Sequence, residues 1–204
     1  MIDLSQVYSV LANLGQKIEI NPIKEIKNSQ GKIIYRNPCP GQFCPISQAI
    51  DSGIAFILND ILSDNQARAM AFGTNSLLQI PNQKTAVKTG TSNNLRDNWC
   101  IGYTPSLLTA VWVGNNDNSP MSRVASGITG ATPIWHKIMG ELLKNQPGED
   151  WLMPENVVKT TICQMTGTLT CPGCPQTTWE YFTEGTAPTE HCRFEEISTP
   201  TPQP

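Results

Sequence analysis

The sequence lacks the features that would place the chain in a membrane or on a nucleic acid. It has no uninterrupted apolar run long enough to span a bilayer, and no run of Lys and Arg that would contact a phosphate backbone. Its amino terminus, Met1–Leu4, has neither the basic nor the apolar segment of a signal peptide. We therefore expect no nucleic-acid partner. For an exported protein, we expect the targeting signal to lie elsewhere, in a longer chain.

Charged residues are also scarce. They make up 15% of the 204 residues, with a net charge of −3, whereas 39% are hydrophobic. Disordered chains are richer in charged residues and poorer in hydrophobic ones, so they cannot bury enough apolar surface to offset the entropy lost on folding. This composition therefore favours a folded chain. Near Gln146 the composition shifts to Pro, Gly, Thr and Cys. We therefore predict a domain over residues 1–145, a Cys-rich extension over 146–197 and a disordered tail over 198–204.

Apolar residues at helical spacing predict four helical segments. They are Asp3–Leu14, a helix capped by Ser47, a short piece over Gln66–Phe72, and a helix that begins at Thr132. The core face predicted for the helix after Ser47 consists of aliphatic residues: Ile50, Ile54, Ile57, Leu58 and Ile61.

Alternating apolar residues predict the strands. A hairpin is expected over Lys17–Arg36, around a turn at Asn28–Gly31. The runs Lys84–Ser92, Asn98–Tyr103 and Ser106–Gly114 follow one another with short links, which favours an antiparallel meander. The predicted fold class is therefore α+β, an α/β sandwich with an antiparallel sheet flanked by helices.

The run with the clearest chemistry lies on the first strand of this meander: Lys88-Thr89-Gly90-Thr91-Ser92. Hydroxyl groups bind a carboxylate, a lysine adds positive potential and takes part in proton relay, and a glycine lets a substrate backbone approach the strand edge. Lys-Thr-Gly is one of three motifs of the penicillin-interacting serine enzymes. By itself the run is better explained as a polar edge strand, and only the flanking segments favour the functional interpretation.

The flanking segments resemble the carboxy-terminal half of a penicillin-binding protein transpeptidase domain, closest to the class A bifunctional proteins of the 1C type. The segments that carry the resemblance are Asn93–Pro105, Val111–Asn115, Thr129–Trp135, Ile61–Arg68 with Ala71–Gly73, and the tail residues Glu180, Phe182, Gly185, Thr186, Pro188 and Cys192. The resemblance covers about residues 2–192 and implies a partial β-lactamase/transpeptidase-like fold.

The resemblance also implies roles for the residues of the Lys-Thr-Gly strand. Lys88 would belong to the catalytic hydrogen-bond network, and the backbone N–H of Thr91 would form half of an oxyanion hole. Thr89, Gly90, Thr91 and Ser92 would bind substrate, with the hydroxyls of Thr89 and Thr91 on a D-alanine carboxylate. The implied partners are peptidoglycan stem peptides and β-lactams, with no cofactor and no metal.

The nucleophile of that family, Ser-x-x-Lys at a helix N-terminus, has no convincing match. Ser29-Gln30-Gly31-Lys32 fits the letters, but it lies in a predicted turn and Gly31 disfavours a helix. Ser63-Asp64-Asn65 fits the further Ser-x-Asn motif, but it ends a helix and lies too close to Lys88. We therefore expect this chain to be inactive alone and to need a missing amino-terminal half of the domain.

Seven cysteines remain to be explained. For Cys163, Cys171, Cys174 and Cys192 we favour two disulfides in an oxidising compartment, with a zinc site as the alternative and the pairing left open. Cys39 and Cys44 form a disulfide or stay free, and we favour the bond. Cys100, in an apolar strand, is expected to be a buried thiol.

Three functions compete. The leading one is a partial, serine-type D,D-transpeptidase domain of peptidoglycan synthesis, extracytoplasmic and anchored through the missing part, whose full-length parent also has a glycosyltransferase. The second is a degenerate or split module that binds a partner chain or cell-wall peptide without catalysis. The third, a β-lactamase-type hydrolase, is disfavoured by the segments around Gly102-Tyr103 and Val113-Gly114 and by the tail.

Overall fold

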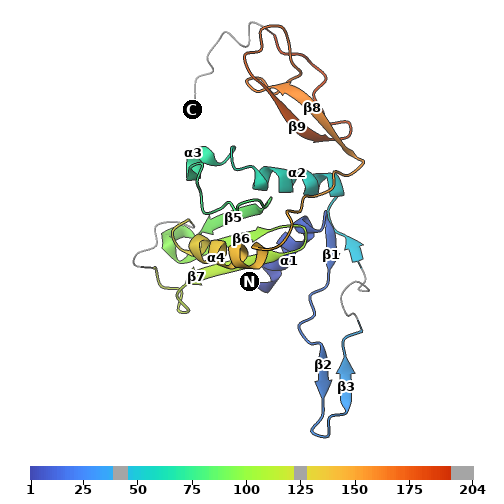
Figure 1. Ribbon diagram of the computed structural model, residues 1–204, viewed down its shortest axis with the longest axis vertical. Helices are drawn as coiled ribbons and strands as arrows, with labels where there is room; N and C mark the ends of the chain where they lie inside the picture. Colours follow the sequence, from blue (N-terminus) through green and yellow to red (C-terminus); the bar gives the residue numbers. More distant parts are fainter. Residues whose placement is uncertain (39–45, 122–127, 194–204) are drawn as a thin grey trace. The chain divides into compact units, whose positions relative to one another are not determined.

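The computed structural model describes residues 1–38, 46–121 and 128–193. The chain forms two compact units, Met1–Trp151 and Leu152–Pro204. Helices and small antiparallel sheets are mixed along the chain, so the fold is α+β as expected (Figure 1). The units divide at residues 151/152, and the assignment of 1–145, 146–197 and 198–204 to separate domains stays a prediction.

A three-stranded sheet organises the first unit. Its strands β5 (Ala86–Thr91), β6 (Asp97–Tyr103) and β7 (Leu108–Gly114) are antiparallel neighbours in chain order, which confirms the predicted meander. A single 3-10 turn, η1 (Asn93–Leu95), links β5 to β6. The strand β5 lies at one edge of the sheet, so its outer backbone groups face away from β6.

The two faces of this sheet pack against different helices. On one face, Trp135 of α4 (Ala131–Leu143) is fully buried and its indole N–H reaches the carbonyl of Gly102. On the other face, the Tyr103 hydroxyl donates to Asn59 of α2 (Ser52–Ser63), and Asn59 donates to the Leu11 carbonyl of α1 (Ile2–Ala12). These contacts between helices and sheet form the core of the unit.

The start and the buried face of α2 differ from the sequence prediction. Ser47 is not the N-cap, because it lies in strand β4 (Ile46–Gln48); the Asp51 carboxylate accepts from the N–H groups of Gly53 and Ile54 instead. The predicted core face is also wrong: the buried residues are Gly53, Ala55, Phe56 and Asn59, while Ile54, Leu58 and Ile61 are exposed. A short helix, α3 (Ala69–Phe72), follows as expected.

The predicted amino-terminal hairpin is confirmed only in its outer half. Strands β2 (Glu25–Lys27) and β3 (Ile33–Arg36) pair across the turn that contains Gly31, as expected. The strand before them, β1 (Gln16–Ile18), pairs with β4 instead. The sequence distance between β1 and β4 hid this pairing from a local pattern.

The second unit contains a hairpin that the composition did not predict. Strands β8 (Val157–Cys163) and β9 (Thr177–Thr183) pair in antiparallel register over their full length. The alternating aromatic residues of β9 were the available signal. Among the described residues, no helix is long and apolar enough to cross a bilayer.

Candidate functional site

The Lys-Thr-Gly run forms the free edge of the central sheet. Lys88 and Thr91 are exposed, whereas Thr89 and Gly90 are half-buried. Each residue of β5 pairs with one of β6 on the inner side, and no described strand pairs with the outer side. The backbone of Gly90 therefore remains open to an added strand. A methyl group at Gly90 would make only an ordinary contact with Trp99, so packing inside the fold does not demand this glycine.

The pleat of β5 separates the predicted site residues into two sets. Side chains alternate between the faces of a strand, so Thr89 and Thr91 share one face while Lys88 and Gly90 share the other. The Lys88 ammonium donates to the carbonyl of Thr89 at 2.6 Å. The two sets are both reachable only from the free edge of β5. A ligand that lay along this edge would contact side chains of both sets.

The Thr91 hydroxyl is tied to the interior by a residue that sequence did not single out. Asn98, fully buried, donates from its side-chain nitrogen to Thr91 Oγ1 at 3.4 Å. Its side-chain oxygen accepts from the backbone N–H of Ala131 at 2.7 Å, at the start of α4. In the sequence, the only indication of this role was that Asn98 is a polar residue at an inward-facing position of an apolar strand. Asn98 thus links α4 to the strand edge.

Ser92 is engaged in a turn and not in the open edge. Its hydroxyl donates to Asp97 Oδ2 at 2.8 Å and accepts from the Asp97 backbone N–H. Trp112 Nε1 donates to the other oxygen of Asp97, and these bonds from Trp112 and Ser92 lower the pKa of the Asp97 carboxyl. The network holds the β5–β6 turn in place, and the predicted substrate contact of Ser92 stays a prediction.

A cavity of about 140 Å³ lies against the middle of β5. It is lined by Val87, Lys88 and Thr89 of the strand and by Ile61, Leu62, Arg68, Phe72 and Leu78. The Arg68 guanidinium donates to the carbonyls of Leu62 and Leu78, and burial lowers the pKa of Arg68. Arg68 and Lys88 thus make one side of the strand cationic beside an apolar hollow, an arrangement suited to an acyl group that carries a carboxylate.

The two serines that matched catalytic motifs have structural surroundings. Ser29 lies in the β2–β3 turn, outside any helix. The Ser63 hydroxyl donates to the Asp60 carbonyl at the end of α2. The following Asp64 caps the next turn by accepting from the N–H groups of Gln66 and Ala67. Neither serine stands at a helix N-terminus with a lysine one turn away.

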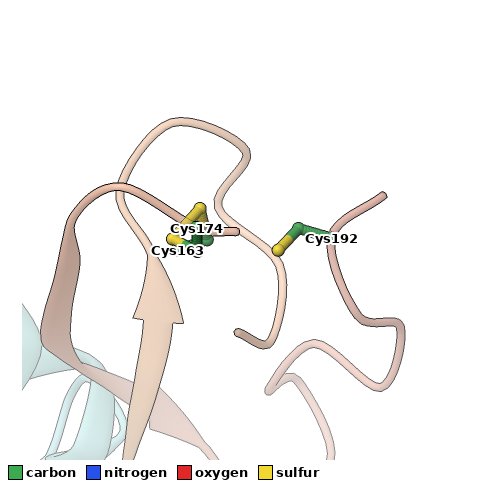
Figure 2. A group of neighbouring side chains, drawn as sticks. All are labelled: Cys163, Cys174 and Cys192. Carbon is green, nitrogen blue, oxygen red and sulfur yellow. A yellow bond between two sulfur atoms is a disulfide. The ribbon is translucent and has the colours of Figure 1, made fainter. Parts of the chain in front are cut away.

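The second unit brings four of the predicted cysteines together. Cys163 is bonded to Cys174, and Cys171 is bonded to Cys192, with Cα atoms 6.0 and 5.3 Å apart. Figure 2 shows that Cys192 lies beside the first of these bonds; the sulfur atoms of Cys163, Cys174 and Cys192 are within 4.8 Å of one another. The structure therefore joins these four cysteines as two disulfides and gives the pairing that the sequence left open.

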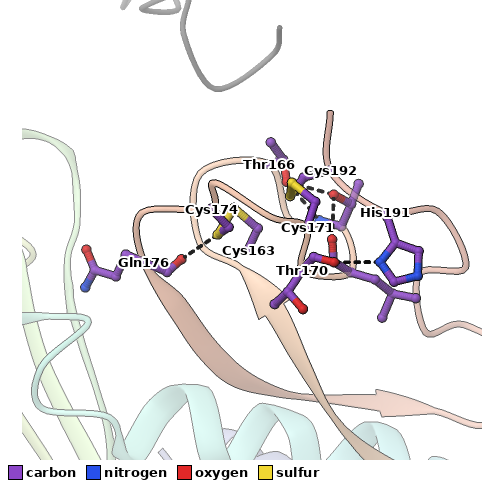
Figure 3. Close-up of a disulfide and its surroundings, with 10 residues drawn as sticks. Cys163, Thr166, Thr170, Cys171, Cys174, Gln176, His191 and Cys192 are labelled. Carbon is purple, nitrogen blue, oxygen red and sulfur yellow. Dashed lines mark hydrogen bonds between the residues drawn. A yellow bond between two sulfur atoms is a disulfide. The ribbon is translucent and has the colours of Figure 1, made fainter. Parts of the chain in front are cut away.

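The surroundings of the disulfides are mostly backbone. Cys163 is fully buried and Cys192 nearly so. In Figure 3 the His191 ring lies against the backbone of the neighbouring segment, its Nδ1 2.6 Å from the Thr170 carbonyl oxygen. The backbone N–H of Cys192 donates to the Leu169 carbonyl. Leu169 also forms isolated β-bridges with Ile162 and with His191, so the backbone near both disulfides is hydrogen-bonded. These contacts are typical of structural disulfides that stabilise a small unit.

The other three cysteines divide into two cases. Cys100 is a fully buried free thiol on β6, as predicted, and burial raises its pKa to about 11. A thiol with such a pKa is a poor nucleophile at neutral pH. Cys39 and Cys44 lie outside the described residues, and the disulfide proposed for them stays a prediction.

Comparison with known proteins finds relatives that are penicillin-binding proteins. The family described as "Penicillin-binding protein 1A, C-terminal domain" matches residues 153–194. The chain is 35% identical to penicillin-binding protein 1A of Neisseria lactamica over 76% of its own length and 19% of the relative. It is 30% identical to penicillin-binding protein 2D of Bacillus subtilis over 94% of its own length and 27% of the relative. The chain thus spans about a fifth to a quarter of these relatives.

Solved structures show the same fold. Penicillin-binding protein 1A from Haemophilus influenzae superposes with a TM-score of 0.72, at 22% identity, over 93% of this chain and 33% of that one. The PonA1 protein of Mycobacterium tuberculosis, solved in complex with penicillin V, superposes with a TM-score of 0.57 at 24% identity, over 75% of this chain and 40% of that one. The finer assignment to the 1C type stays a prediction.

Proposed function

The chain is homologous to the carboxy-terminal region of the class A penicillin-binding proteins, and from this premise we propose that it supplies the substrate-binding wall of a D,D-transpeptidase site in peptidoglycan synthesis. The observation that carries the proposal is the open edge of β5, where Lys88, Gly90 and Thr91 lie beside a mostly apolar cavity that is also lined by Arg68. The substrate is a stem peptide that ends in a D-alanine carboxylate, or a β-lactam that mimics it.

In this proposal the substrate backbone lies along β5 as an added strand. The Thr89 and Thr91 hydroxyls hold the terminal carboxylate, and the Thr91 N–H stabilises the oxyanion that forms when a serine oxygen adds to the scissile carbonyl. Collapse of that intermediate breaks the amide, the leaving D-alanine amine takes a proton, and an acyl-enzyme remains. Lys88 contributes positive electrostatic potential at the strand edge and takes part in proton transfer there.

The serine nucleophile is proposed to come from a segment other than Ser29 or Ser63. Two features support this: Ser29 lies in a hairpin turn, and Ser63 is bonded to Asp60 at a helix end. The relatives are also several times longer than the matched region. The alternative of a non-catalytic module remains the second function to be tested.

Fluorescent penicillin labelling of the 204-residue chain tests the absence of a nucleophile. We expect no covalent adduct by intact mass, because acylation needs an activated serine. Covalent labelling at Ser29 or Ser63 would overturn this part of the proposal.

A second experiment tests the substrate-binding wall in the longest product of the same reading frame. If that product acylates, Lys88→Ala should slow acylation by about 10²–10⁴-fold, the range for loss of a proton-transfer group. Lys137→Ala, an exposed lysine on α4, is the matched control and should leave the rate unchanged. Equal rates for Lys88→Ala and Lys137→Ala would overturn the role proposed for Lys88, whereas a full-length product that does not acylate would favour the non-catalytic module.

A further inference from the structure

The β8–β9 hairpin presents an aromatic and cationic face that no function described above uses. In its register Lys159 pairs with Tyr181 and Thr161 pairs with Trp179. Paired residues of an antiparallel ladder point to the same face, so these four side chains lie together. The opposite face carries Ile162, which is buried. Both faces are partly exposed: Val157 and Cys163 are buried at the ends of the first face, whereas Lys159 and Trp179 at its centre are exposed.

Trp179 is unusually exposed on this face. Its side chain is 61% accessible, whereas Trp135 and Trp151 in the other unit are 0% and 6% accessible. A tryptophan buries a large apolar area when it is covered, so leaving it exposed forgoes a substantial stabilisation. An exposed indole on a strand face is typical of a binding surface rather than of a core.

Lys159 adds an ordered positive charge to this face. Its ammonium nitrogen lies 5.5 Å from the Trp179 ring centroid and 5.3 Å from the Tyr181 ring centroid. Cation–π contacts at such distances restrain the lysine without neutralising its charge. Among the residues that the structure describes, Lys159 makes no ion pair, and Glu180 pairs with Thr160 on the opposite face. The charge is available to an anionic ligand.

We propose that this face binds a polysaccharide whose sugars carry carboxylates. Aromatic rings stack on the C–H faces of sugar rings, a threonine hydroxyl exchanges hydrogen bonds with sugar hydroxyls, and the restrained ammonium pairs with a carboxylate. Neither described cavity is lined by residues of this face, and an open strand face suits an extended polymer rather than a small enclosed ligand. All of its residues lie in the second unit, whereas β5 belongs to the first.

The test is binding by the intact 204-residue chain to soluble glycan strands of peptidoglycan from which the peptides have been removed. These strands alternate an uncharged and a carboxylate-bearing amino sugar, and without peptides they offer nothing to the β5 edge. Chitin oligosaccharides of the same length are the uncharged comparison. Titration is followed by tryptophan fluorescence and by sedimentation.

We expect Trp179→Ala to weaken binding by tenfold or more, and Lys159→Met to lower the affinity for the carboxylated strand to that for chitin oligosaccharides. Met165→Ala, a change at another exposed residue of the same unit, is the control and should bind as the unmodified chain does. Near-ultraviolet circular dichroism checks that each variant is folded, and since Lys159 is exposed, Lys159→Met keeps the proposal testable if Trp179→Ala does not fold.

Three results would overturn the proposal. They are no saturable binding by the unmodified chain, unchanged binding by both Trp179→Ala and Lys159→Met, and tighter binding to a single-stranded oligonucleotide, which also stacks on aromatic rings. Because the probe lacks peptides and covalent chemistry, each of these results leaves the proposal for the β5 edge untouched.

Discussion

At the scale of single residues, two neighbours on β6 show how tightly the sheet is packed against α4. Gly102 lies under the indole of Trp135, and Cys100 lies in the same buried cluster as Met139. Both residues are buried, and both belong to β6, the strand that pairs with β5. Changes here test the scaffold of the site without touching its exposed groups.

Gly102→Ala should destabilise the chain. A methyl group at this position would overlap atoms of the Trp135 ring, and overpacking of a core costs about 1–3 kcal/mol. Urea unfolding followed by circular dichroism measures the change. Gly140→Ala is the matched control, because a methyl group there meets nothing within 4 Å in the middle of α4, and it should stabilise by about 0.4–1 kcal/mol. Equal effects of both changes would contradict the packing described here.

Cys100 should make stability depend on alkaline pH. Burial raises its pKa from 9.0 to about 11, so the neutral thiol is favoured in the folded state. The unfolded thiol ionises first, and the free energy of unfolding should therefore fall as pH rises from 9.0 to about 11.

Urea unfolding at about pH 8 and about pH 10.5 checks this, with Cys100→Ala as the control. The unmodified chain should lose more stability between the two values than Cys100→Ala does. The same loss in both proteins would show that other groups carry the effect.

At the scale of elements, the two disulfides replace a core that the β8–β9 hairpin is too small to supply. A two-stranded hairpin is marginal in water by itself. The bonds close sequence separations of 11 residues for Cys163–Cys174 and 21 residues for Cys171–Cys192. They therefore constrain both the end of β8 and the segment that follows β9.

Removing either disulfide should destabilise the second unit by about 2–4 kcal/mol. The double change Cys171→Ser/Cys192→Ser should cost about half a kcal/mol more than Cys163→Ser/Cys174→Ser, because it opens a loop about twice as long. Thermal unfolding without reductant measures both. Peptide mapping under non-reducing conditions is the control for the pairing, and bound zinc with four free thiols would refute it.

At the scale of the whole molecule, the helices present apolar residues on two sides. The exposed aliphatic residues of α2 and α4 recur at helical spacing: Ile54, Leu58, Ile61, Ile134, Ile138 and Leu142. A helix that is apolar around more than its core-facing stripe is normally covered on more than one side. The described part of the chain covers only the inner face of each.

The isolated chain should therefore self-associate. Sedimentation velocity over a range of concentrations should show species larger than a monomer, because burial of exposed apolar surface drives association. Replacing Ile54, Leu58 and Ile61 together by glutamate should shift the population toward monomer. A monodisperse monomer at high concentration in the unmodified chain would contradict this prediction.

Local sequence patterns were sufficient to predict the central sheet, the family resemblance and the burial of Cys100. Alternation gave the β5–β6–β7 meander, because neighbouring strands with short links have few other ways to pair. The Lys88–Ser92 run and its flanks identified the family resemblance. The buried state of Cys100 followed from its place in an apolar strand.

Only the tertiary structure decided which faces and partners those elements use. The exposure of the Ile54 face of α2, the pairing of β1 with β4, the choice of cysteine partners and the link from Asn98 to Thr91 all depend on residues distant in sequence. Helical periodicity reports that a face is apolar, but it does not report what covers that face. A pairing between distant segments is set by the packing of the whole unit, which no local window contains.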